Sequence, residues 1–136
     1  MILIIYVISI LLIMTAILLI YYWIDFFLRK GVQVIQEEWY IKFQKAFPVA
    51  DIWAALCALL GAVGLLTEQN YGLLFSLLAA GSLIFLALID ITFNAENKLY
   101  HLVGTSNEMK LELAGNIWFL SVGIVLIIYV WTKMVI

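Results

Sequence analysis

The chain has 136 residues, of which 67% are hydrophobic and only 12% are charged. Soluble domains use roughly half apolar and a quarter charged residues, so this composition excludes an ordinary soluble domain and favours a membrane protein. The formal net charge of −2 says little about partners, but the sequence has no basic tract that would suggest a nucleic-acid partner. The single cysteine, Cys57, excludes an intrachain disulfide framework and a paired-cysteine metal site.

The first predicted element is a membrane span over residues 2–27. Its apolar run exceeds the roughly 7 to 15 residues of a signal-peptide core, so we expect the span to be retained. Tyr22 and Trp23 are typical of a membrane interface, and basic residues follow them. Asp25 can pair with Arg29 one helical turn later, or it can contribute to a polar site.

The next segment, residues 32–47, has the periodicity of an amphipathic helix that lies in the membrane surface, with Trp39 as an anchor. Pro48, the only proline, follows it. The Asp51 carboxylate is then predicted to cap a short second span over residues 52–66 by accepting backbone N–H bonds.

The third predicted span covers residues 71–93 and follows a polar turn of four residues, 67–70. So short a turn predicts an antiparallel hairpin between the second and third spans. Both spans carry small residues at helical spacing, which lets helix backbones approach closely in lipid. These small residues are Ala54, Ala58, Gly61 and Gly64 in the second span and Gly72, Ser76 and Ala80 in the third.

A polar connection over residues 95–109 is the longest nonhelical candidate, and the fourth span is predicted over residues 111–133 with Glu112 in its first turn. The predicted fold class is therefore all-α: a polytopic membrane protein with four transmembrane helices in an antiparallel bundle and an interfacial helix between spans one and two. We expect residues 1–136 to form a single integral membrane domain.

The basic residues predict the orientation of the bundle. All but Lys133 fall on one side of the threaded spans, and an excess of Lys and Arg is typical of cytoplasmic connections. The N- and C-termini are then predicted to lie on the non-cytoplasmic side. The residues on the predicted cytoplasmic side are Arg29, Lys30, Lys42, Lys45, Lys98 and Lys110.

Asp90 is the most informative residue, because it lies inside the third apolar run. A carboxylate in hydrocarbon costs several kcal/mol by most estimates, so such a residue is a functional-site candidate. Two arrangements could stabilise it. Lys98 or Lys110 could form an ion pair with Asp90 between spans three and four, or Asp90 and Glu112 could share one proton.

Threading the four spans brings further polar side chains to the level of Asp90, near the predicted cytoplasmic ends of the helices. We therefore expect a pocket open to the cytoplasm. The candidate ligand-binding residues are Asp25, Asp90, Asn94, Glu112, Asn116 and Trp118. No cofactor and no metal ion is expected, because the spacing of Asp90, Glu96 and His101 matches no metal-site signature.

Three functions are compatible with this pattern. The first is binding or transport of a small cationic or polar-headgroup ligand, which in so thin a bundle favours a homo-oligomer. The second is an enzyme of the membrane that acts on a lipid or isoprenoid, with Asp90 or Glu112 as general acid or base. The third is an accessory or assembly subunit of a membrane complex, whose polar cluster locks the bundle. The expected partners are the lipid bilayer, a lipid or small cationic ligand, and a second copy or another membrane protein.

Overall fold

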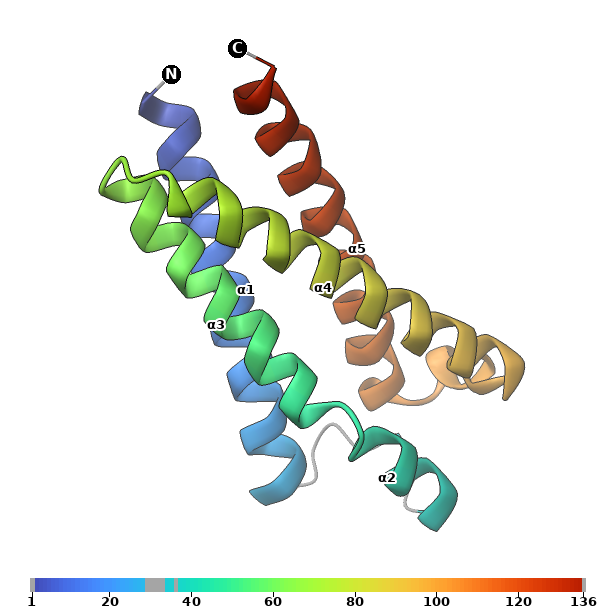
Figure 1. The fold of residues 1–136 in the computed structure, drawn as a ribbon. Helices are drawn as coiled ribbons and strands as arrows, with labels where there is room; N and C mark the ends of the chain where they lie inside the picture. The colour runs from blue at the N-terminus through green and yellow to red at the C-terminus, as the bar shows by residue number, and fades with distance from the viewer. Residues whose placement is uncertain (1, 29–33, 36, 136) are drawn as a thin grey trace.

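The fold consists of helices alone throughout the part of the chain that the computed structural model describes, residues 2–28, 34–35 and 37–135 (Figure 1). The elements are α1 (Ile2–Leu28), α2 (Glu38–Gln44), α3 (Pro48–Leu66), α4 (Tyr71–Glu96), the 3₁₀ turn η1 (Leu99–Gly104) and α5 (Asn107–Met134). Four stretches are long and apolar enough to cross a membrane: Ile2–Leu28, Glu38–Leu66, Tyr71–Glu96 and Asn107–Met134. The predicted all-α class is confirmed, and the chain is a multi-pass membrane protein.

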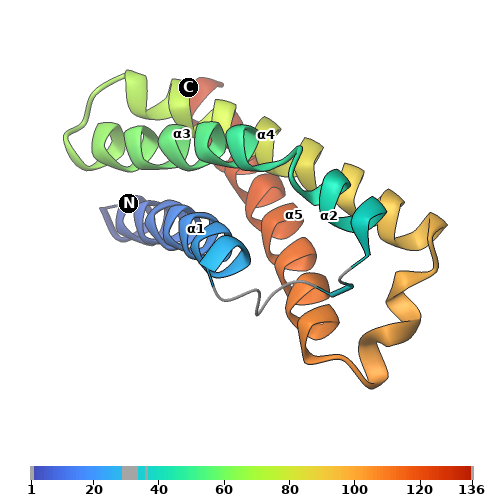
Figure 2. The ribbon, with the colours of Figure 1, turned by 90° about the horizontal axis from the view of Figure 1, so that it is seen from below.

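The four long helices run antiparallel in chain order, so both termini lie at the same end as the turn between α3 and α4 (Figure 1). α3 and α4 form a central hairpin, α1 packs along α3, and α5 packs along α4. By contrast, α1 and α5 make few direct contacts, and the view from below shows them apart (Figure 2). The hairpin of α3 and α4 therefore lies at the centre of the bundle, and α1 and α5 pack against it while making few contacts with each other.

Small residues hold α3 and α4 in backbone contact, as the sequence pattern predicted. A Cβ atom built on Gly64 would lie only 2.4 Å from the backbone of Gly72. One turn away, a Cβ on Gly61 would lie 2.9 Å from Oγ of Ser76. Such close approach is available only to glycine, and it maximises van der Waals contact where lipid supplies no hydrophobic driving force between helices.

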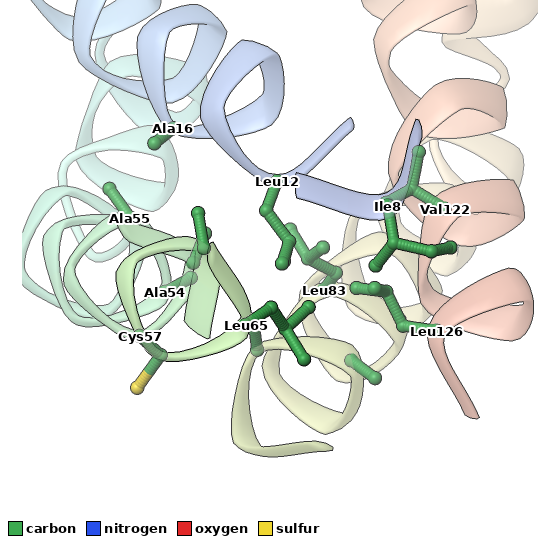
Figure 3. Packing of buried hydrophobic residues seen from close by; sticks show 14 of the residues in the cluster. Ile8, Leu12, Ala16, Ala54, Ala55, Cys57, Leu65, Leu83, Val122 and Leu126 are labelled. Carbon is green, nitrogen blue, oxygen red and sulfur yellow. The ribbon is translucent and has the colours of Figure 1, made fainter. Parts of the chain in front are cut away.

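Most of the apolar core lies in the half of the bundle nearer the termini. Figure 3 shows the packing of its side chains. Leu12 of α1, Leu83 of α4 and Leu126 of α5 are almost completely inaccessible and meet at its centre. Alanines of α3, including Ala54 and Ala55, complete the core on the opposite side. The other half of the bundle is where the polar side chains gather.

The prediction that Asp51 caps a helix beginning at Ile52 is wrong. α3 begins at Pro48, because a proline in the first turn has no N–H to lose and its fixed φ suits the helix start. Asp51 therefore lies one turn inside α3, and its side chain does not cap the helix. The second span begins four residues earlier than the predicted range of 52–66.

The predicted interfacial helix over residues 32–47 is shorter in the structure. Residues 32, 33 and 36 lie outside the described part of the chain, and the helix α2 covers only Glu38–Gln44. Its aromatic face packs inward on α4, since Phe43 stacks on Phe93 with ring centroids 3.8 Å apart. Tyr40 is fully buried beside them, while Trp39 remains exposed. The regular spacing of aromatic residues in this segment therefore reflects packing against α4.

The connection predicted as nonhelical, residues 95–109, is largely helical. α4 continues to Glu96, η1 follows, and α5 already begins at Asn107. Ser106 explains the early start, because its Oγ accepts a hydrogen bond from the backbone N–H of Met109 over 3.1 Å, as in an N-cap. Glu112 consequently lies in the second turn of α5, and its expected place in the first turn is wrong.

A candidate acidic binding cavity

A cavity of about 420 Å³ lies between α1, α3, α4 and α5, in the half of the bundle nearer α2. Its volume is within the range of about 300–1,000 Å³ that is typical of small-molecule sites. Most of its lining is apolar, but three carboxyl side chains reach it from three different helices: Asp51 of α3, Asp90 of α4 and Glu112 of α5. No Lys, Arg or His is among the described residues that line it.

Asp90 is half-buried on the inner face of α4. Its Oδ1 accepts a hydrogen bond from the side-chain amide of Gln44 over 3.5 Å. Asp90 lines the same cavity as Glu112. Two ionised carboxyl groups around one cavity repel each other, and no basic side chain among the described lining residues offsets their charge.

Glu112 is buried, and polar side chains of two other helices form hydrogen bonds with it. Its Oε2 accepts a hydrogen bond from the Tyr22 hydroxyl over 3.2 Å, and its Oε1 accepts one from the Asn94 amide over 3.5 Å. The two donors come from α1 and α4, so their bonds to Glu112 join three helices. Hydrogen bonds to a buried carboxyl compensate part of the cost of removing it from water.

Tyr100 of η1 joins two amides behind the cavity. Its hydroxyl oxygen accepts hydrogen bonds from Asn116 over 2.8 Å and from Asn94 over 3.4 Å. Burial raises the pKa of the Tyr100 phenol above its usual value of about 10, and the two amide donors only partly oppose this rise. The hydroxyl therefore stays protonated at neutral pH and retains a proton to donate.

Asp51 is the third acid of the cavity and has its own donor. The indole Nε1 of Trp23 donates to its Oδ2 over 2.6 Å, and both side chains are buried. This bond ties α1 to the first turn of α3. The carboxyl group is therefore fixed in position at the edge of the cavity, where it also faces the other two acids.

Polarity changes along the cavity in the same direction on α4 and on α5. On α4, Asp90 lies at the end near α2, and Leu83 lies two turns further in, about 10 Å away at 1.5 Å per residue. On α5 the order is Glu112 and then Phe119. The cavity therefore has an acidic end and an apolar end.

The structure brings together five of the six residues predicted as ligand-binding. Asp90, Glu112, Asn116 and Trp118 line the cavity, and Asn94 lies directly behind it through its bond to Glu112. Asp25 is buried in α1 but is not among the lining residues. Its predicted partner, Arg29, lies outside the described residues.

Four participants were missed by the sequence reasoning, each for a recognisable cause. Tyr22 was interpreted as an interfacial aromatic residue, and Asp51 as a helix cap. Gln44 lies in the segment predicted as a helix on the membrane surface, although it is buried. Tyr100 was part of a connection assumed to be nonhelical. The one feature of the sequence that could have indicated these four residues was the clustering of polar residues at a single level of the bundle.

The alternative in which Lys98 or Lys110 neutralises Asp90 is not what the structure shows. Both lysines are exposed, and the only ion pair within the described residues joins Lys42 to Glu38 on α2. Asp90 instead turns toward the cavity, where its neighbours are an amide and another acid. An ion-pair lock therefore does not explain its position.

Comparisons with known proteins give no assignment: no protein-family model, no curated protein and no solved structure matches the chain.

Proposed function

We propose that the protein binds a small organic cation in the acidic cavity. Three carboxyl side chains around one cavity, with no basic side chain among its described lining residues, are the observation that carries this proposal. Carboxyl groups in a medium of low dielectric constant need a counter-charge or a proton. A cationic ligand supplies the counter-charge.

Aromatic side chains add a second source of attraction for such a ligand. Tyr22, Trp23 and Trp118 line the same cavity as the acids. The face of an aromatic ring attracts quaternary ammonium groups, with energies of about 0.5 to 2 kcal/mol that increase when the pair is removed from water. The combination of acids and aromatic rings favours an ammonium compound over an inorganic cation, which prefers oxygen ligands alone.

Binding of tetramethylammonium to Glu112→Gln is expected to be roughly 10- to 100-fold weaker than to the wild type, because a charge-assisted contact of about 1.5–3 kcal/mol is lost. The measurement is equilibrium binding of the radiolabelled ion to protein in lipid nanodiscs. Glu96→Gln is the matched control, since Glu96 is exposed at the end of α4 and does not line the cavity. Equal affinity in the wild type and Glu112→Gln, or no saturable binding, would contradict the proposal.

We also propose that the acidic end of the bundle faces the cytoplasm. Lys42, Lys45, Lys98 and Lys110 lie toward that end, whereas Lys133 lies at the opposite one, and cytoplasmic connections are typically basic.

Labelling of intact cells with a membrane-impermeant maleimide tests this orientation in a Cys57→Ala background. Glu68→Cys, in the turn between α3 and α4, is expected to react, whereas Glu96→Cys, at the other end of α4, is expected to react only after lysis. Both residues are exposed, so accessibility within the fold is matched. The opposite pattern would reverse the proposed orientation.

A further inference from the structure

The cavity is lined by residues of both α1 and α5, and some of these residues are also exposed on the surface of the bundle. Two hydrogen bonds join these helices: Tyr22 to Glu112 near the acidic end, and the indole Nε1 of Trp118 to Oγ1 of Thr15 over 3.1 Å at the apolar end. They are separated by seven residues on α1 and six on α5, or about 9–10 Å along the helices. Figure 2 shows the backbones of α1 and α5 apart, and the two helices make few contacts. We call the stretch between the two hydrogen bonds the window.

The rim of this window is apolar and accessible. Leu18 of α1 and Leu111 of α5 line the cavity and are also exposed, 44% and 59% respectively. Gly115 lies on the same side of α5, where an added Cβ would meet only the ring of Phe119, at 3.7 Å. The window therefore opens from the cavity onto the surface of the helices that faces hydrocarbon in a multi-pass membrane protein.

We propose that the ligand is a lipophilic amine, with one ammonium head and one hydrocarbon tail, that reaches the cavity from the bilayer through the window between α1 and α5. This inference rests on the proposed binding of a cation at the acidic end. The head lies among Asp51, Asp90 and Glu112, and the tail follows the apolar lining toward Leu83 and Phe119. A phospholipid fits poorly, because its phosphate would be brought against three carboxyl groups.

Gly115→Leu provides the test, because Gly115 lines the cavity between Glu112 and Phe119. Its new side chain would fill both the window and the space proposed for the tail, while the acids remain. Binding of dodecyltrimethylammonium and tetramethylammonium, which share one head group, is measured in nanodiscs after subtraction of uptake by empty nanodiscs. For Gly115→Leu we expect at least a tenfold loss of affinity for the dodecyl compound and less than a threefold change for tetramethylammonium. Gly81→Leu is the matched control, since Gly81 is exposed on α4, lies outside the cavity, and has nothing within 4 Å of the position that a Cβ would take.

The two compounds separate this inference from the proposed function. If tetramethylammonium binds in a Glu112-dependent manner but the dodecyl compound does not bind, the tail has no place in the cavity, and only the inference is overturned. Equal losses for both compounds in Gly115→Leu, or no loss for either, would also overturn it. Failure of both compounds to bind the wild type would overturn the proposed function as well.

Discussion

Replacing Gly64 with alanine is expected to lower the free energy of unfolding by roughly 2–3 kcal/mol, at the upper part of the range for an overpacked interface. The added methyl group would lie 2.4 Å from Cα and N of Gly72. Both are backbone atoms, so no side chain can rotate away, and α3 and α4 must separate by about 1 Å to restore van der Waals distance. The measurement is equilibrium unfolding in mixed micelles with increasing dodecyl sulfate, followed by circular dichroism.

Gly81→Ala is the matched control for this substitution. It is also a helical glycine of the α3–α4 hairpin, but nothing lies within 4 Å of its Cβ position. Alanine is preferred over glycine in a helix by about 0.5–1 kcal/mol, so this variant should be slightly more stable than the wild type. Equal stability of Gly64→Ala and Gly81→Ala would show that the backbone contact does not limit the packing of α3 on α4.

Replacing Trp23 with phenylalanine is expected to lower the free energy of unfolding by about 2 kcal/mol. The change removes the indole N–H that donates to Asp51 over 2.6 Å and leaves a carboxyl group, only 8% exposed, without that donor. Loss of a hydrogen bond to a charged group costs about 1.5–3 kcal/mol. Unfolding in the same mixed micelles measures the effect, and Trp53→Phe, at a side chain that is 50% exposed, should cost less than about 0.5 kcal/mol.

A double-mutant cycle with Asp51→Ala assigns the loss to the bond itself. If the indole acts through Asp51, Trp23→Phe should cost less in the Asp51→Ala background than in the wild type, with a coupling energy of about 0.5–3 kcal/mol. Strictly additive effects would mean that Trp23 stabilises the protein through its aromatic contacts alone, such as the edge-to-face contact with Phe26 at 4.9 Å.

The sequence predicted the architecture well because span length and small-residue spacing are local properties. The apolar runs marked the four long helices, and the four-residue spacing of Gly72, Ser76 and Ala80 predicted the contact with α3 that the glycines make. The residues at which the helices begin were harder to predict. Pro48 and Ser106 each begin a helix about four residues before the apolar run, because proline at the first turn and a serine cap act independently of hydrophobicity.

The sequence predicted that the acids of the candidate site lie at one level of the bundle. It did not predict which side chains form hydrogen bonds with them. Asp90 and Glu112 were expected at one level, since both are acids near the ends of adjacent spans. Which side chains satisfy them depends on helix rotation, and hydropathy does not determine rotation. Tyr22 thus turned out to bond Glu112, although an aromatic residue at a span end is usually assigned to the membrane interface.

The glycine contact between α3 and α4 also has a mechanical consequence. α1 is attached to α3 and α5 is attached to α4, whereas the two outer helices share few contacts: a pair of hydrogen bonds and apolar packing in the core. α1 can therefore tilt against α3, and α5 can tilt against α4, while the hairpin of α3 and α4 keeps its shape. The window between α1 and α5 can then widen by breaking two hydrogen bonds, and the close glycine contact between α3 and α4 is left undisturbed.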